Sequence, residues 1–124
     1  MAQLNFRSES VGAGDQSWLG SRHGVDTAKS VTLDPAAWTA KIVAGTIKSG
    51  EPFASVSGLA VPYNSGGSGG TNVLAGFILN DTSVVAGAGN VTLPGLWHGR
   101  ILLSKLPSAV PATATTTGLF ALEA

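Results

Sequence analysis

The pattern of hydrophobic and polar positions changes near residue 30. Residues 1–30 show no sustained periodicity, and glycines are spaced among their polar residues, which is typical of an extended arm. From Ser30 onward, Val31 and Leu33 alternate with polar neighbours, the period of a half-buried strand. We therefore predict a flexible N-terminal arm over residues 1–30 and a single folded domain over residues 31–124.

Short strands separated by glycine are predicted for most of this domain. Glycine recurs after Lys41, and strand-forming residues fill the intervals between the glycines, as in mainly β domains. A turn signal, Ser-Gly-Glu-Pro at residues 49–52, predicts that the first two of the strands pair as a hairpin. The expected strands cover residues 42–48, 54–61, 73–80, 90–93 and 96–103.

Local signals predict three further features. Asp34 followed by Pro35 fits an N-cap and the first position of a short helical turn that carries Trp38. The Ser-Gly-Gly-Ser-Gly-Gly stretch at residues 65–70 fits a flexible surface loop. Near the C-terminus, prolines and threonines predict irregular chain or one weak helical turn before an apolar segment at residues 119–122. The expected fold class is mainly β, with one or two short helical turns.

Composition narrows the classes of function. The 124 residues fit one domain with its own core. Charged residues make up 11% of the chain, against about 25% in ordinary soluble domains. Because the 7 basic residues equal the 7 acidic ones in number, there is no net field to attract nucleic acid or anionic lipid. We therefore expect neither nucleic acid nor membrane as a partner.

The cellular setting is also constrained by what the sequence lacks. It contains no cysteine, so neither a disulfide framework nor a thiolate metal site can form. Its longest apolar stretch is far below the ~20 residues that span a bilayer. The N-terminal residues lack the apolar run of a secretory signal. These features predict synthesis and retention in a cytosol-like compartment.

Candidate chemistry is sparse. Asp15, Ser17 and His23 are close in sequence, but a hydrolytic triad needs a rigid scaffold that a flexible arm does not give. His23 and His98 lack the clustered carboxylate or helical spacing of a metal site. The glycine-rich stretches do not continue into a phosphate-binding motif. We expect no catalytic residue, no metal and no cofactor.

The three tryptophans divide into two groups. Trp38 and Trp97 lie among strand or turn residues, and we interpret both, with Phe77, as packing in the core or in a trimer. Trp18 lies on the arm, where it either folds back on its own domain or docks on a partner. Burying an indole removes ~150–250 Å² from water, a gross gain of about 4–6 kcal/mol. Such a side chain is large enough to fix the position of an otherwise flexible arm.

An ordered series of short motifs covers nearly the whole chain. The motifs are WLGS and HG within residues 18–24, VTLD at 31–34, IKSGEP at 47–52, LAGFIL at 74–79, HGRI at 98–101 and LP at 106–107. In this series the chain resembles bacteriophage head decoration proteins of the lambda type, and related capsid decoration proteins of tailed phages that infect actinobacteria.

The resemblance implies a β-clip-like domain that forms homotrimers on the outer surface of the mature phage head. Such trimers occupy local three-fold positions of a major capsid protein with the HK97-type fold, after synthesis in the bacterial cytoplasm. Their arms become ordered by pairing with capsid segments, in agreement with an arm that folds on binding and adds a strand to an exposed sheet edge. The arm residues expected to bind the capsid are Leu4, Phe6, Trp18, Leu19 and His23.

Two other classes of protein fit the same composition. A phage tail-tube or baseplate module would share the small, cysteine-free β domain, and would form rings or filaments rather than trimers. A carbohydrate-binding or adhesin-like β module displayed on a virion would need exposed aromatic side chains. An enzyme is the class that the sequence favours least.

Overall fold

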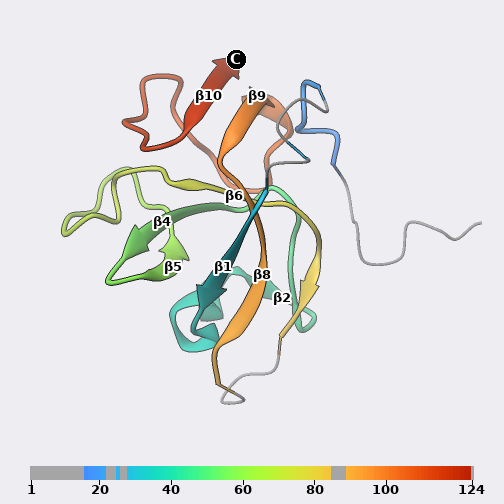
Figure 1. Cartoon of the computed structure of the whole chain (residues 1–124), viewed down its shortest axis with the longest axis vertical. Coiled ribbons are helices and arrows are strands. Elements are labelled where there is room, and N and C mark those ends of the chain that lie inside the picture. The colour runs from blue at the N-terminus through green and yellow to red at the C-terminus, as the bar shows by residue number, and fades with distance from the viewer. Residues whose placement is uncertain (1–15, 22–24, 26–27, 85–88, 124) are drawn as a thin grey trace, which may run out of the picture.

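The computed structural model describes residues 16–21, 25, 28–84 and 89–123, and these form a small, mainly β domain (Figure 1). Its elements follow one another along the chain as β1 (Lys29–Leu33), the 3-10 helix η2 (Pro35–Lys41), β2 (Ile42–Val43), β3 (Thr46–Ile47), β4 (Pro52–Val56), β5 (Leu59–Pro62), β6 (Gly76–Ile78), β7 (Thr82–Ser83), β8 (Val91–Leu96), β9 (His98–Leu102), the 3-10 helix η3 (Leu103–Lys105) and β10 (Leu119–Glu123). The predicted fold class, mainly β with short strands and short helical turns, is confirmed.

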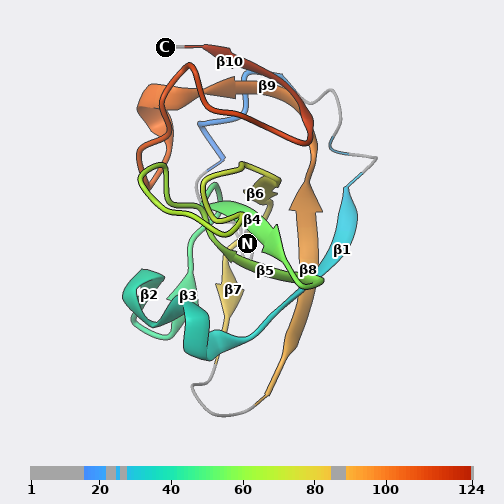
Figure 2. The same ribbon diagram turned by 90° about the vertical axis from the view of Figure 1, so that its left-hand side faces the viewer.

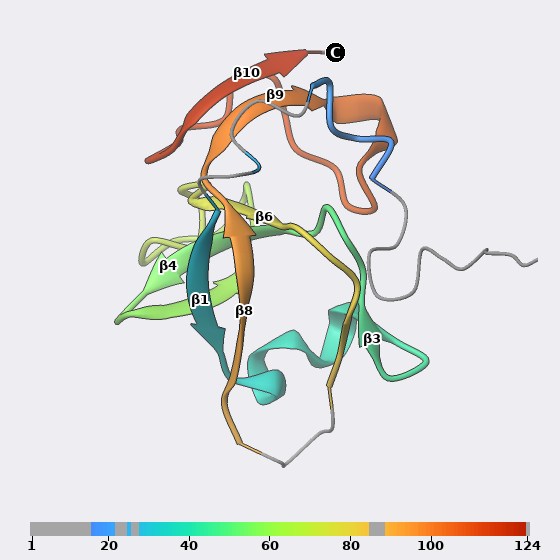
Figure 3. The same ribbon diagram turned by 45° about the vertical axis from the view of Figure 1, so that its right-hand side comes forward.

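Five strands close into a barrel in the order β1-β5-β4-β6-β8. β1 and β8 run antiparallel along the whole of β1 and lie side by side in Figure 3. The barrel closes on the other side of β1 through a single parallel register pair, Leu33 with Ala60 of β5. Among the described strands, none pairs with the rest of this edge of β1.

Two smaller sheets extend the barrel. β3 pairs with β2 and β7 in one antiparallel sheet. β9 and β10 form a parallel pair at one end of the molecule (Figure 2). Leu19, just after Trp18, makes an isolated antiparallel bridge to Ile101 of β9. The N-terminal segment thus lies against β9 on the side opposite β10.

β6 divides the buried side chains into two clusters. Successive side chains of a strand point to opposite faces, and Phe77 and Ile78 accordingly pack in different clusters. One cluster fills the barrel around Trp38 and Phe53. The other lies between the barrel and the β9–β10 pair, around Trp18 and Phe77.

The local helix signal is confirmed. The Asp34 carboxylate accepts a hydrogen bond from the Ala36 N–H at 3.0 Å, and Pro35 begins the helix η2. Trp38 of this helix is completely buried, and its indole N–H donates to the Ala60 carbonyl at 2.9 Å. The cap therefore directs Trp38 into the barrel.

Two predicted strands are instead hairpins, so these predictions are wrong. Residues 42–48 turn at Ala44–Gly45, and residues 54–61 turn at Ser57–Gly58, with positive φ at both positions of each turn. Hairpin turns of this kind favour Asn-Gly or Asp-Gly, so Ala-Gly and Ser-Gly gave a weak signal. The predicted pairing of these two segments is also wrong, because β3 pairs with β2 and β7 while β4 pairs with β5 and β6.

In the last third of the chain, strands form where they were predicted, but their lengths differ from the prediction. The segment predicted over residues 73–80 keeps only Gly76–Ile78 as a strand, and β8 continues through Pro94 to Leu96. The predicted final apolar segment forms the strand β10. The chain between η3 and β10 is irregular, the first of the two alternatives predicted for it, and the helical turn η3 lies before it, at Leu103–Lys105. Within the residues that the structure describes, no helix has the length and apolar character needed to cross a membrane.

Candidate interaction sites

The Trp18 side chain belongs to the core of its own domain. It has no exposed surface, and its ring centroid lies 5.6 Å from that of Phe77. The indole N–H donates to the Ser49 hydroxyl at 3.0 Å, and this hydroxyl donates to the Leu79 carbonyl at 2.7 Å. Of the two interpretations left open for Trp18, folding back is the one observed. Its prediction as a capsid-contacting side chain is corrected, because the domain already encloses the ring.

The residues around Trp18 are fixed by backbone hydrogen bonds. The Gly20 N–H donates to the Arg100 carbonyl at 2.8 Å, and the Leu102 N–H donates to the Trp18 carbonyl at 2.7 Å. The Gln16 amide donates to the Leu79 carbonyl at 2.8 Å. The described base of the predicted arm is therefore part of the domain, and Leu19, which bridges β9 and packs on the core, shares this position.

Other arm predictions fall outside the described part of the chain. Leu4, Phe6 and His23 lie there, as does Asp15. The possible triad and the possible two-histidine metal site are therefore not placed. Among the described residues, no three His, Cys, Asp or Glu side chains gather as a metal site.

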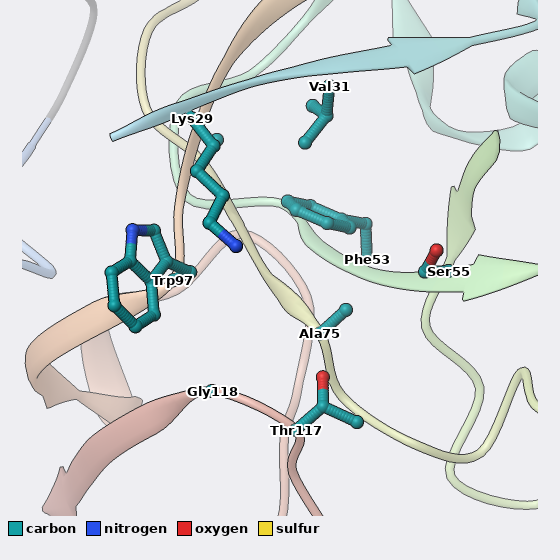
Figure 4. Close-up of a pocket in the computed structure, with 9 residues that line it drawn as sticks. Lys29, Val31, Phe53, Ser55, Ala75, Trp97, Thr117 and Gly118 are labelled. Atoms are coloured by element: carbon teal, nitrogen blue, oxygen red, sulfur yellow. The ribbon is translucent and has the colours of Figure 1, made fainter. Parts of the chain in front are cut away.

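The mouth of the barrel forms a pocket of about 220 Å³ (Figure 4). Lys29 and Val31 lie on the same side of β1 as buried Leu33, because side chains two apart share a face. Phe53 of β4 also lines this pocket. The remaining lining residues come from β4, the segment before β6, β8, the link between β8 and β9, and the segment before β10: Ser55, Ala75, Gly95, Trp97, Thr117 and Gly118.

Two glycines allow Phe53 to lie across the barrel. A Cβ added at Gly95 would lie 3.0 Å from Phe53 Cζ and 3.1 Å from Val31 Cγ1. A Cβ at Gly76 would meet Phe53 and the Leu96 carbonyl oxygen. Because Gly95 and Gly76 have no side chain, the Phe53 ring can occupy the space beside them. The ring thus lies at the inner end of the mouth.

Trp97 lies at the rim of this pocket rather than in the core. It is half-buried, and it belongs to neither core cluster. The Lys29 ammonium lies over its ring, 4.9 Å from the centroid, a cation–π arrangement. The prediction that Trp97 packs in the core is therefore wrong, while Trp38 and Phe77 are completely buried as expected. Packing of these residues in a trimer stays a prediction.

The edge of β1 beside this pocket presents backbone hydrogen-bonding groups. Ser30 lies opposite Pro94 of β8, and proline has no N–H to donate. The Pro94 carbonyl accepts from the Leu79 N–H at 3.2 Å, on the side away from β1. Because antiparallel pairs alternate between bonded and non-bonded positions, the N–H and C=O of Ser30 point away from β8. They face a second hollow, which shares Val31, Phe53 and Ser55 with the mouth.

A buried carboxylate, that of Glu51, lies in the connection between β3 and β4. Glu51 is 5% exposed, and the Ser108 hydroxyl donates to it at 2.7 Å. The Lys41 ammonium donates to the same hydroxyl at 3.0 Å. Burial raises the pKa of Glu51 above its ordinary value, while the bond from Ser108 and the charges of Lys41 and Lys48 oppose this shift. The hydrogen bond between Glu51 and Ser108 links the β3–β4 connection to the segment after η3.

A second exposed edge lies on β10. This strand pairs only with β9 among the described strands, and Leu119 is 63% exposed. On the same pair of strands, the Arg100 Nε donates to Glu123 at 2.6 Å, which lowers the pKa of Glu123. An unpaired edge with an exposed leucine can add a strand from another chain.

Sequence reasoning missed the barrel mouth and the Glu51 contact. The alternation that predicted β1 extends back to Lys29, and continuing it would have placed Lys29 beside Val31 on the inner face. The other features of the mouth depend on contacts between residues far apart in sequence, such as Gly95 with Phe53. No protein-family model, curated protein or solved structure matches the chain. Assignment to a family therefore remains a proposal.

Proposed function

We propose that the chain is a capsid decoration protein, which binds as a homotrimer to local three-fold positions on the outer surface of a mature phage head. The motif series described above supports this proposal. The partner is a major capsid protein of the HK97-type fold. The role is mechanical, because ligands that bind only the assembled, expanded shell stabilise that state by mass action against internal DNA pressure.

One observation carries most weight: the predicted arm begins from a rigid base. Trp18 is enclosed in the core, and residues 16–20 are hydrogen-bonded to β9 and to the segment that follows β6. The point at which the predicted arm joins the domain, at Gln16, is thus defined. At about 3.3 Å per extended residue, residues 1–15 can reach up to ~50 Å. Three such arms on a trimer bind with avidity, so each contact can be weak.

The arm residues proposed to meet the capsid are now Leu4, Phe6 and His23, since Trp18 and Leu19 pack against their own domain. Leu4 and Phe6 are two residues apart, so an extended conformation would present both on one face. This arrangement suits strand addition to a capsid segment, where alternate side chains give specificity. The exposed edge of β10 is the surface we propose for contact between copies.

The test is a truncation that spares the base. Removing residues 1–15 keeps Trp18 and Gln16, so the domain should stay folded and form the same oligomer. It should fail to bind undecorated heads in a sedimentation assay. A full-length Val11→Ala variant, altered in the same segment at a residue outside the proposed contact set, should bind normally. Saturation of the heads by the truncated chain would contradict the proposal.

A further inference from the structure

We infer that the barrel mouth is a docking site for residues 3–9 of the same chain, with the Phe6 ring seated beside Trp97 and Phe53. This goes beyond the proposed function and does not depend on it, because it concerns the isolated protein. The inference rests on the shape and chemistry of the mouth, on the unpaired edge of β1, and on the length of chain that precedes Gln16.

The mouth has the size and lining for one aromatic ring. Its volume is about 220 Å³, and an apolar cavity of about 150 Å³ takes up benzene. Val31, Phe53 and Ala75 give it apolar walls, and the Trp97 ring stands at the rim under the Lys29 ammonium. Figure 4 shows Lys29, Trp97 and Phe53 around one opening. Pockets at the mouths of barrels are common ligand sites.

The edge of β1 offers the backbone groups that an added strand requires. Ser30 directs its N–H and C=O away from β8, as its position opposite Pro94 dictates. The parallel partner β5 reaches β1 only at Leu33. An extended segment can therefore pair with β1 at Ser30 while one of its side chains enters the mouth, the arrangement of strand-addition complexes.

Residues 3–9 have the matching pattern. Phe6 is the sole aromatic residue among the first fifteen, and Leu4 precedes it by two, with polar Asn5 between them. This period-two alternation is that of a strand with one apolar face. None of the described residues lining the mouth is acidic, and Lys29 supplies its positive charge. Arg7 and Glu9 balance each other within residues 3–9, so the segment brings no net positive charge to the mouth.

The chain is long enough to reach the site within one molecule. Gln16 is held to the Leu79 carbonyl at 2.8 Å. Ala75, which lines the mouth, precedes Leu79 by four residues through β6, about 13 Å at the rise of a strand. The ten residues from Phe6 to Gln16 extend up to ~33 Å, which leaves length to pass around the barrel. Docking within one chain also benefits from a high effective concentration.

Docking would place Phe6 out of reach of any partner. The same side chain cannot enter the mouth and contact a capsid at once. Binding to a capsid would then require release of the segment, and the affinity for the capsid would fall by the fraction of molecules that hold the segment docked.

Tryptophan fluorescence provides a direct test on the full chain. Trp18 and Trp38 have no exposed surface, so quenching by acrylamide reports mainly on half-buried Trp97. Phe6→Ala should raise the quenching constant and shift the emission to longer wavelength, because the ring that covers Trp97 is lost. Val11→Ala, in the same segment, should match the unmodified protein. Equal quenching in all three proteins would overturn the inference.

Two further measurements identify the occupant. Protection of Trp97 should be unchanged on dilution if the segment belongs to the same chain, and protection that falls on dilution would overturn that assignment in favour of a second copy. A nitroxide attached at Ser8→Cys, in a chain that has no other cysteine, should broaden the indole N–H signal of Trp97 more strongly than that of Trp38. Equal signals for the two indoles would contradict docking at the mouth.

Discussion

Trp18 and Trp97 lie at two regions of the molecule that differ in what covers them. Trp18 sits between the barrel and the β9–β10 pair, where Phe77 packs beside its ring and Ser49 accepts from its indole N–H. Trp97 stands at the barrel mouth, where the neighbouring edge of β1 pairs with β5 at one position only. The comparison shows that position in the sequence is a poor guide to burial. What decides it is whether a second sheet closes over the ring.

The largest expected effect concerns the two rings themselves. Trp18→Ala should lower the free energy of unfolding by about 3–5 kcal/mol, the usual cost of deleting a buried indole. Trp97→Ala should cost about 1 kcal/mol or less, since it removes a half-buried ring and one cation–π contact. Chemical denaturation of both variants measures the difference. If the two variants lose the same free energy of unfolding, then Trp18 is not more deeply buried than Trp97.

A smaller effect is expected at the bottom of the mouth. Gly95→Ala places a Cβ 3.0 Å from Phe53 Cζ and 3.1 Å from Val31 Cγ1. The neighbours must move, and we expect a loss of about 1–3 kcal/mol. Gly66→Ala is the matched control, because its nearest neighbour would lie 3.8 Å away. If the two variants unfold at the same denaturant concentration, the close packing of Phe53 on β8 is not as described.

The smallest effect concerns Glu51, which lies two residues from the Ser49 that anchors Trp18. Burial raises its pKa in the folded state, so this group favours folding while protonated. That contribution is complete below the pKa of the unfolded chain and is lost as pH rises through the higher pKa of the folded state. Glu51→Gln should abolish this part of the pH dependence of the free energy of unfolding.

The measurement is the free energy of unfolding of the two proteins across acidic pH. As pH rises above about 4.5, the ordinary pKa of a glutamate carboxyl, the free energy of unfolding of the unmodified protein should fall relative to that of Glu51→Gln. The exposed Glu123, whose pKa is lowered by Arg100, acts in the opposite direction in both proteins. A difference that does not vary with pH would mean that Glu51 is not desolvated.

Local signals in the sequence predicted part of this fold and little of the candidate sites. Asp34 and Pro35 act within one turn of chain, so the cap on η2 could be predicted. The turns at Ala44–Gly45 and Ser57–Gly58 lack the asparagine or aspartate that marks a hairpin, and each hairpin was therefore predicted as a single strand. The Trp18 contact depends on Ser49, 31 residues away. No period or turn signal encodes such a contact.

The barrel mouth likewise could not be predicted from local signals in the sequence. Residues of β1, β4 and β8 line it together, and each of these residues looks ordinary in its own segment of the sequence. The motif series alone suggested a partner, and the structure changes which arm residues can meet it. Trp18 moves from the proposed contact surface to the described base of the predicted arm.

The most direct test of the proposed function is a cryo-EM map of undecorated phage heads incubated with the full chain. The account predicts trimeric density at local three-fold positions on the outer surface, with the barrel outside and residues 1–15 in contact with the capsid protein. Heads that show no added density at saturating protein would contradict it.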